Sequence, residues 1–296
     1  MDAVVVSHNE GENLERTVHW PLATLRDDGR VIVVDDASDD GSAELVAKRY
    51  PTVRVVRPPA RLGAVAARNF GASHAGGDTI LFADAHVEPP YGWYEAFSEM
   101  LEDPGVGAVG PGVEAIGNGA TRGYGMTWKD AGMNVTWLPR MGSEPYPVPI
   151  LGGFFVAMRR DVLEATAGFD EGLIRWGGAD VELSLRLWSL GYECVLIPSV
   201  RVGHLFRSRL PYSLPRYAYA HNLLRIASIH LSERRLARVI EELRRWPSFA
   251  GALARFVDSD AWRRRDELRS RRRRDDQWFC ERFGIDVFDR KPKEEQ

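Results

Sequence analysis

The chain has 296 residues, of which 44% are hydrophobic and 27% charged, and its formal net charge at neutral pH is −3. This apolar content suffices for one large domain or two modest ones and excludes a mainly disordered chain. Two cysteines, Cys194 and Cys280, are too few for a disulfide framework and match no paired zinc motif, which favours a reducing compartment. No basic leader and no run approaching the ~20 apolar residues of a membrane span is found. We therefore expect a cytoplasmic protein.

Charge is distributed unevenly along the chain. Residues 1–200 carry 16 lysines and arginines against 28 aspartates and glutamates, a balance of −12, whereas residues 201–296 carry 23 against 14, a balance of +9. The acidic first part argues against a nucleic-acid-binding protein. The arginine runs at 263–265 and 271–274 have two interpretations, contact with an anionic partner or the solvated face of a helix, and the sequence favours neither.

The first third of the chain alternates strand-like and helix-like segments. The apolar runs are continuous and of strand length, as in parallel strands covered on both faces. Such alternation predicts a mostly parallel sheet with right-handed crossovers. Strands are predicted at residues 3–7, 31–34, 53–57 and 79–83, and helices at 9–25, after the turn that ends near residue 42, and at 63–74.

The composition changes after residue 104. Glycine, proline, tryptophan and tyrosine accumulate in residues 105–149, which predicts short antiparallel strands and loops bordering a cleft. A strand at 151–158, an amphipathic helix at 180–190 and a last strand at 194–197, ended by Pro198, are predicted next. Beyond residue 208 the apolar spacing is helical, and we expect a helical extension packed on the core.

Polar residues follow two of the predicted strands. Asp84 and His86 come after the strand at 79–83, where both side chains can turn to one point above the carboxyl edge of the sheet. A carboxylate and an imidazole suit a divalent ion such as Mn²⁺, although so short a pattern is weak on its own. Asp35 and Asp36 follow the strand at 31–34. Carboxylates there can accept hydrogen bonds from a nucleoside, or they can organise the turn. Both interpretations can hold at once, with one aspartate for each role.

Two later segments carry further candidates. Asp180 follows the glycine-rich stretch Trp176-Gly-Gly at the start of a helix, where it serves either as an ionised base or as a helix cap. His204 lies after the last predicted strand and either completes a metal site or is structural. Arg207 has the bidentate geometry that grips phosphate.

In their order along the chain, these blocks resemble the family-2 glycosyltransferases of GT-A fold, most of all the polypeptide N-acetylgalactosaminyltransferases. The resemblance extends from Val4 to about Ile229, and ordered motifs are far more specific than any single one. The matching motifs are His8-Asn9-Glu10 with Arg16-Thr17-Val18, Val34-Asp35-Asp36, Arg61-Leu-Gly with Ala67-Arg68-Asn69, Asp84-Ala-His86-Val-Glu88, Gly152-Gly153-Phe154, Trp176-Gly-Gly178 with Glu182-Leu-Ser-Leu-Arg186, Val202-Gly-His204 with Phe206-Arg207, and Asn222-Leu-Leu-Arg225-Ile-Ala227.

The resemblance implies an α/β GT-A fold with a mostly parallel central sheet flanked by helices and a helical C-terminal extension. It implies a Rossmann-like nucleotide-sugar half at 1–110, an acceptor-side half with the catalytic loop at 111–207, and a lid with the basic helical extension at 208–296. The segment 205–219, with Phe206, Arg209, Tyr212 and Tyr217, resembles the mobile loop that covers the donor and excludes water, the alternative being an ordinary connector.

The resemblance also implies a UDP-sugar donor, first an N-acetylhexosamine (UDP-GlcNAc or UDP-GalNAc), and Mn²⁺ or Mg²⁺ as cofactor. The metal would stabilise the departing diphosphate together with Arg207, and Trp176 would line the donor. The implied metal ligands are Asp84, His86 and His204. The implied donor-site residues are Asp35, Asp36, Arg61, Arg68, Ala85, Gly152, Gly153 and Tyr212.

The sequence departs from the resemblance at two places. The family reads Trp-Gly-Gly-Glu-Asn where this chain has Ala179 and Asp180, and many inverting family-2 enzymes place an aspartate base there. We therefore expect an inverting transfer with Asp180 as base, the alternative being the family's retaining route. The anchor and the lectin module of eukaryotic members have no counterpart in the sequence, in line with the cytoplasmic expectation.

The acceptor and the reaction class leave alternatives. A peptide side chain is one acceptor, and a small aglycone, carried by an acidic protein that meets the basic tail, is the other. A non-catalytic nucleotide-sugar-binding protein is one rival class. A metal-dependent nucleotidyltransferase or phosphohydrolase is the other, but it would want a glycine-rich first loop, and residues 7–13 contain a single glycine. The oligomeric state is left open.

Overall fold

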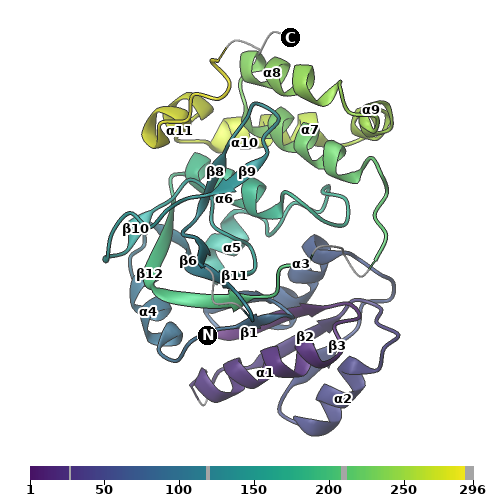
Figure 1. The fold of residues 1–296 in the computed structure, drawn as a ribbon, viewed down its shortest axis with the longest axis vertical. Coiled ribbons are helices and arrows are strands. Elements are labelled where there is room, and N and C mark those ends of the chain that lie inside the picture. The colour runs from purple at the N-terminus through teal and green to yellow at the C-terminus, as the bar shows by residue number, and fades with distance from the viewer. Residues whose placement is uncertain (27, 118–120, 208–211, 291–296) are drawn as a thin grey trace.

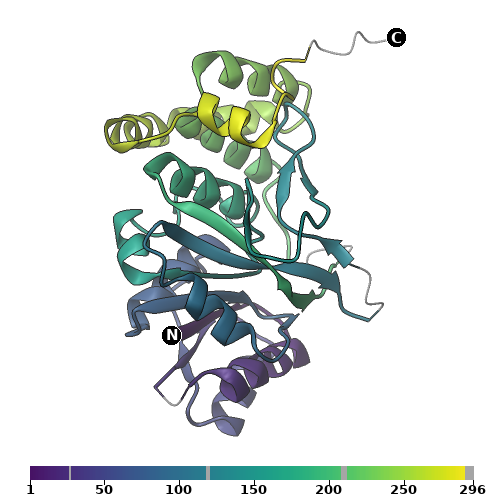
Figure 2. The ribbon, with the colours of Figure 1, turned by 90° about the vertical axis from the view of Figure 1, so that its left-hand side faces the viewer.

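The computed structural model describes residues 1–26, 28–117, 121–207 and 212–290, and its centre is a mixed sheet of ten strands. The strand order is β10-β12-β6-β11-β4-β1-β2-β3, with β5 paired to β12 and β7 to β6. Figure 1 shows the helices α1 and α2 at one end of the molecule, the sheet in the middle, and the helices α7 to α11 at the other end. Figure 2 shows the same order from the side.

The N-terminal strands form the parallel part of the sheet. β1 pairs with β2 and β4, and β2 with β3, all in parallel. Successive residues of β1 enter opposite cores, Val4 with α3 on one face and Val5 with α1 and α2 on the other, as expected for strands covered on both sides. The predicted strands and helices of this part are confirmed. They are β1 (Asp2–Ser7), α1 (Glu12–Thr24), β2 (Val31–Asp35), α2 (Ser42–Arg49), β3 (Arg54–Val56), α3 (Ala64–His74) and β4 (Thr79–Asp84).

The second part of the sheet mixes directions. β11 (Phe155–Arg159) runs antiparallel between β4 and β6 (Val106–Ala115), and β12 (Glu193–His204) runs parallel to β6. Parallel pairing is therefore confined to β3-β2-β1-β4 and to β6 with β12. The other elements here are β5 (Val87–Glu88), α4 (Trp93–Met100), β7 (Thr121–Gly123), β10 (Tyr146–Pro147), α5 (Arg160–Ala165), and the separate two-stranded sheet of β8 (Met126–Trp128) and β9 (Val135–Trp137).

Two predicted strand bounds in this part are wrong. The strand predicted from residue 151 begins only at Phe155, because residues 151–152 form no strand and residues 153–154 form a turn. The last strand does not stop at Pro198 but continues to His204, with a register shift between Ile197 and Arg201. Proline is tolerated at such an irregularity because a bulged residue donates no ladder hydrogen bond. The longer β12 carries His204 to the edge of the sheet.

The C-terminal part is helical, as predicted. In α8 the residues Leu236, Val239 and Leu243 are buried in the same core as α6 and α7. Along the residues that the structure describes, no helix has the length and apolarity needed to span a bilayer. The helices are α6 (Ala179–Leu190), α7 (Ala218–His230), α8 (Glu233–Leu243), α9 (Phe249–Val257), α10 (Ala261–Arg271) and α11 (Asp276–Phe283).

Candidate active site at the sheet edge

A carboxylate and two imidazoles meet at the edge of the sheet. Asp84 ends β4, His86 follows in the next turn, and His204 ends β12. Because β5 pairs with β12, with Val87 opposite His204, the two histidines are brought side by side, and their ring centroids lie 4.9 Å apart. One ligand atom from each of the three residues lies within 4.8 Å of the others. Residues far apart in the sequence thus converge as the resemblance implied.

The chemistry of this cluster suits a divalent cation. His204 Nε2 lies 3.6 Å from Asp84 Oδ2, whereas His204 Nδ1 is buried and has no hydrogen-bond partner in the described part of the chain. Burial by itself would raise the pKa of Asp84, but the imidazole of His204 and the guanidinium of Arg68 hold that pKa well below its usual range. An ionised carboxylate with two imidazoles is a donor set that fits Mn²⁺.

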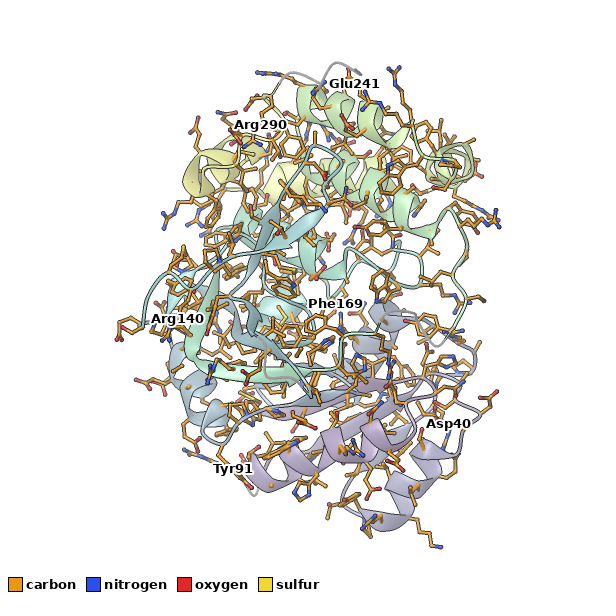
Figure 3. The ribbon with its side chains drawn as sticks, in the orientation of Figure 1. Asp40, Tyr91, Arg140, Phe169, Glu241 and Arg290 are labelled. Atoms are coloured by element: carbon orange, nitrogen blue, oxygen red, sulfur yellow. The ribbon has the colours of Figure 1, made fainter. Side chains whose placement is uncertain are left out.

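Arg68 and Gly153 complete the neighbourhood of Asp84. Arg68 is buried on α3, and its Nη2 donates to Asp84 Oδ1 at 2.9 Å and to the carbonyl oxygen of Gly153 at 2.8 Å. Its guanidinium lies 5.4 Å from the ring centroid of Phe169, which is near the centre of the molecule in Figure 3. A Cβ on Gly153 would lie 3.3 Å from the Cβ of Asp180, so the chain passes close to that residue.

Asp35 and Asp36 are buried and organise backbone. Asp36 accepts hydrogen bonds from the amides of Leu62 at 2.6 Å and Gly63 at 2.8 Å, which fixes the turn that precedes α3. Asp35 accepts from the amide of Ser38 at 3.0 Å and from Arg57 Nε at 2.8 Å. Asp35 therefore performs the turn chemistry that the sequence offered as one alternative, whereas Asp36 fixes the turn before α3.

Arg61 and Tyr212 lie beside this turn. The guanidinium of Arg61 is 4.8 Å from the ring centroid of Tyr212, and the His8 ring is 5.7 Å away from that ring, edge to face. The segment predicted as a lid therefore contacts the loops after β1 and before α3. Phe206 packs on His204 with centroids 4.6 Å apart, whereas Arg209 lies outside the described residues.

Asp180 lies in the first turn of α6, after the glycine-rich loop. The N-cap position is Gly178, in the left-handed conformation, so Asp180 is not the helix cap. Its Oδ1 accepts the amide of Val181 at 2.9 Å. Burial, reinforced by the charge of Asp84, raises the pKa of Asp180 above its usual value. A carboxylate with a raised pKa is a stronger base once ionised.

The remaining predicted residues lie around the same edge. Trp176 is 44% exposed, with its ring centroid 6.4 Å from that of Tyr219. Ala85 is buried between the two metal-candidate residues of its turn. A Cβ on Gly152 would lie 2.5 Å from the ring of Phe154, so a larger residue there requires that ring to move.

Sequence reasoning assigned no role to Asn222 and Arg225, although both belong to its last matched motif. Asn222 is fully buried on α7, where its Oδ1 accepts the amide of Ile174 at 2.7 Å and its Nδ2 donates to three carbonyl oxygens of the loop, that of Gly177 at 2.9 Å. Arg225 holds Asp170 with two hydrogen bonds of 2.7 Å. The spacing of the two residues by three on one helix was the available signal.

Glu10 also received no role from the sequence. Both of its carboxylate oxygens accept hydrogen bonds from Arg207, one of them at 2.9 Å from Nη1. Oε1 of Glu10 is 3.3 Å from His86 Nδ1. The position of Glu10 just beyond β1, at the edge where Asp84 ends β4, was the signal in the sequence.

Comparison with known proteins decides the family. Residues 2–166 match glycosyl transferase family 2, and residues 143–210 match the N-terminal domain of galactosyltransferase. The chain belongs to glycosyl transferase family 2. The family resemblance recognised in the sequence is thereby confirmed.

Curated relatives of this family-2 chain include polypeptide N-acetylgalactosaminyltransferases. It is 32% identical over 264 residues to polypeptide N-acetylgalactosaminyltransferase 3 of Taeniopygia guttata, a match that covers 78% of this chain and 42% of the relative. The Homo sapiens protein of the same name is 31% identical, with 78% and 41% covered. The chain thus spans less than half the length of these relatives.

Solved structures show the GT-A-like fold. The structure of GalNAc-T7 with UDP, GalNAc and Mn²⁺ has a TM-score of 0.78 at 23% identity, covering 97% of this chain and 57% of that one. The mannosyltransferase PcManGT from Pyrobaculum calidifontis, in complex with GDP-Man and Mn²⁺, has a TM-score of 0.54 at 20% identity, covering 91% and 73%. The predicted α/β GT-A fold is confirmed, with a mixed central sheet.

Proposed function

We propose that this family-2 chain is a metal-dependent glycosyltransferase that moves a sugar from a UDP-sugar to an acceptor. The observation that carries the proposal is the convergence of Asp84, His86 and His204 at the sheet edge, beside Arg68 and Asp180. The names of the relatives support an N-acetylhexosamine as the first donor and a peptide side chain as the first acceptor.

The roles of the residues follow from their places. Asp84, His86 and His204 would hold Mn²⁺ or Mg²⁺, which supplies positive charge to a departing diphosphate. Arg68 keeps Asp84 ionised and oriented through its hydrogen bond. Arg207, on the segment after β12, donates to Glu10 in the structure and would donate to the diphosphate oxygens once they displace that carboxylate. These residues together place positive charge where the leaving group becomes more negative.

The remaining donor contacts lie on the other strands and loops. Arg61 and Tyr212 form the side of the site that receives uridine, and Asp36 fixes the turn that carries Arg61. Gly153 lets the backbone approach the sugar, and Trp176 lines it from the catalytic loop. Closure of the segment 205–219 would exclude water and so limit hydrolysis of the donor. The other predicted donor-site residues are next in sequence to these groups: Asp35 to Asp36, Ala85 to Asp84, and Gly152 to Gly153.

Asp180 is proposed as the base that deprotonates the acceptor in an inverting transfer. Its raised pKa and its place beside Gly153 support this role. Asp180→Asn should lower kcat by about 10²–10⁴-fold with the UDP affinity unchanged, because the base acts only on the acceptor proton. NMR of the product tests the stereochemistry: a β-linked product from the α-linked donor supports inversion, and an α-linked product establishes the retaining route of the relatives instead.

A donor screen tests the proposed function. UDP release and glycosylated product would be measured by mass spectrometry for a panel of UDP-sugars and peptide acceptors, with Mn²⁺ and with EDTA. We expect Mn²⁺-dependent transfer that His204→Ala abolishes and that the matched variant His74→Ala, outside the cluster, leaves intact. Release of a nucleoside monophosphate or pyrophosphate would identify the nucleotidyltransferase or phosphohydrolase class. Binding without turnover would identify a binding protein.

The basic C-terminal segment enters the proposal through the second kind of acceptor. Arg272 and Arg273 are exposed, whereas Arg271 donates to the carbonyl oxygen of Ala165 and Arg274 stacks on Trp278 at 4.4 Å. An acidic carrier that presents a small aglycone would therefore contact Arg272 and Arg273. Arg272→Ala with Arg273→Ala should then slow acceptor capture most at low salt. The division of the chain at residues 110 and 207 and its cytoplasmic location stay predictions.

A further inference from the structure

Glu10 links the two parts of the site that carry positive charge. Its side chain is 7% exposed and lies between Arg207 and His86. Each carboxylate oxygen accepts from one Nη atom of Arg207, so both Nη atoms of the guanidinium bind Glu10. The same Oε1 lies 3.3 Å from Nδ1 of His86, the ring that would offer its other nitrogen to a cation.

The backbone around Glu10 is held rigidly. Asn9 has a positive φ of 54°, and its Oδ1 accepts the amide of Asp39 at 2.9 Å. The amide of Gly11 donates to Asp40 Oδ2 at 2.8 Å. The residues on both sides of Glu10 are thus fastened to the turn after β2. Glu10 cannot follow Arg207 if that side chain turns toward a ligand.

The charges at this edge are balanced in pairs. Glu10 compensates Arg207, and Asp84 compensates Arg68. A diphosphate that arrives alone therefore gains little from Arg207, because it must first displace a buried carboxylate from the guanidinium. A cation gains from Glu10 through the added negative charge, because a carboxylate oxygen lies 3.3 Å from Nδ1 of His86, an atom with no hydrogen-bond partner in the described part of the chain.

We propose that Glu10 is a positioning residue that makes capture of the nucleotide diphosphate conditional on the divalent cation. The proposal rests on the proposed function. Glu10 favours the cation through its negative charge beside His86, and it disfavours the diphosphate alone by occupying Arg207. Once positive charge is added beside Asp84, the diphosphate can compete with Glu10 for the guanidinium.

Binding measurements on Glu10→Gln test this coupling, because glutamine keeps the shape and removes the charge. Titration calorimetry with MnCl₂ alone, and with UDP in EDTA, gives the two affinities without any turnover. We expect the Mn²⁺ affinity to fall about tenfold, at the lower end of what loss of such a supporting carboxylate costs. The metal-free UDP affinity should rise several-fold, because Arg207 is released. Opposite directions of change cannot result from partial unfolding, which would weaken both.

Two further variants complete the design. Glu12→Gln is the matched control, since Glu12 is 84% exposed and pairs only with Arg16 at 3.1 Å among the described residues, and both affinities should stay at the wild-type values. In Glu10→Gln with Arg207→Gln, the gain in metal-free UDP affinity should vanish while the loss of Mn²⁺ affinity remains. If Glu10→Gln does not fold, Glu10→Asp keeps the charge but withdraws the oxygens, and metal-free UDP affinity should still rise.

The outcomes separate this inference from the proposed function. A wild-type chain that binds neither Mn²⁺ nor UDP refutes the proposed function, and the role of Glu10 with it. A wild-type chain that binds both, with the ratio of its UDP affinities in Mn²⁺ and in EDTA unchanged by Glu10→Gln, refutes the coupling alone. A fall of both affinities in Glu10→Gln and Glu10→Asp also refutes it.

Discussion

The two walls of the candidate site are built in different ways. On the metal side, Asp84 and His204 end strands whose positions are set by backbone pairing of β4 with β1 and of β12 with β6 and β5. On the loop side, residues 168–178 form no strand or helix. Their positions are set by hydrogen bonds from the side chains of Asn222 and Arg225 on α7. The metal wall should therefore tolerate loss of a side chain that only fastens its backbone, whereas the loop wall should lose its shape when a single side chain of α7 is removed.

The largest effect is expected from Arg225→Leu on the loop side. This change removes both guanidinium hydrogen bonds of the buried Asp170 and leaves only Arg264 Nε at 3.9 Å, and breaking a buried ion pair costs about 3–5 kcal/mol of unfolding free energy. Urea unfolding followed by circular dichroism measures it. The control Arg234→Leu removes an arginine that is 77% exposed and pairs with Asp289, and should change stability by no more than about 0.5 kcal/mol. Equal stabilities would show that α7 does not hold the loop.

Asn222→Ala should separate the walls functionally. Four hydrogen bonds to the loop are lost, and displacement of a site by about 1 Å typically costs about 10²-fold in rate. The kcat should fall by that amount while the Mn²⁺ affinity stays within about twofold of wild type. Ser228→Ala on the same helix is the control, because its buried hydroxyl has no hydrogen-bond partner in the described part of the chain. A parallel loss of Mn²⁺ affinity would contradict the comparison.

Thr17→Val tests whether the metal side of the site keeps its Mn²⁺ affinity when one side chain that fastens its backbone is removed. The hydroxyl of Thr17 accepts the amide of Val87 at 3.0 Å and donates to its carbonyl oxygen at 3.1 Å, and so fastens β5 to α1. Its removal leaves two buried backbone groups unpaired and should cost about 1–3 kcal/mol of unfolding free energy. The Mn²⁺ affinity should nevertheless change by no more than about threefold, because the pairing of β5 with β12 remains. A collapse of Mn²⁺ binding in calorimetry would show that side chains carry this wall too.

The smallest effect is a shift in the acid limb of the kcat profile. The pKa of Asp180 is raised, and the base acts when ionised, so the rate should fall as pH falls through a value above the usual 3.8 of aspartate. Asp180→Asn should lack this limb. A wild-type rate that stays level down to about pH 4 would contradict the assignment.

Acid unfolding should not interfere with that measurement. Burial opposes ionisation of Glu182, yet Arg186 and His230 lower its pKa to about 2. A lowered folded-state pKa contributes stability that is fully present above the ordinary value of 4.5 and is lost as pH falls toward about 2. The buried contact between α6 and α7 therefore persists over the range in which Asp180 titrates.

The parallel part of the fold and the candidates Asp84 and His86 were predictable because their signals are local, whereas the choice of His204 as a metal ligand over a structural role came only from the family resemblance. Continuous apolar runs define β1 to β4, and Asp84 and His86 directly follow one of them. Pairing with β6 carries β12 past Pro198, and no pattern within that segment reveals it. The contacts of Glu10 and Asn222 are equally non-local, since their partners lie 197 and about 48 positions away in the chain. The family motifs marked both residues, but only the folded structure shows what each one holds.

Arg265 connects the C-terminal helices to the helix that holds the loop of the site. It is 3% exposed on α10, and its guanidinium donates to the carbonyl oxygens of Ser228 and Leu231, which α7 itself leaves unsatisfied at its terminus. Because α7 also carries Asn222 and Arg225, α10 supports the loop at residues 168–178 from a distance, through the end of α7. The basic C-terminal segment thus has a structural task, since one of its arginines holds the end of the helix that positions the loop.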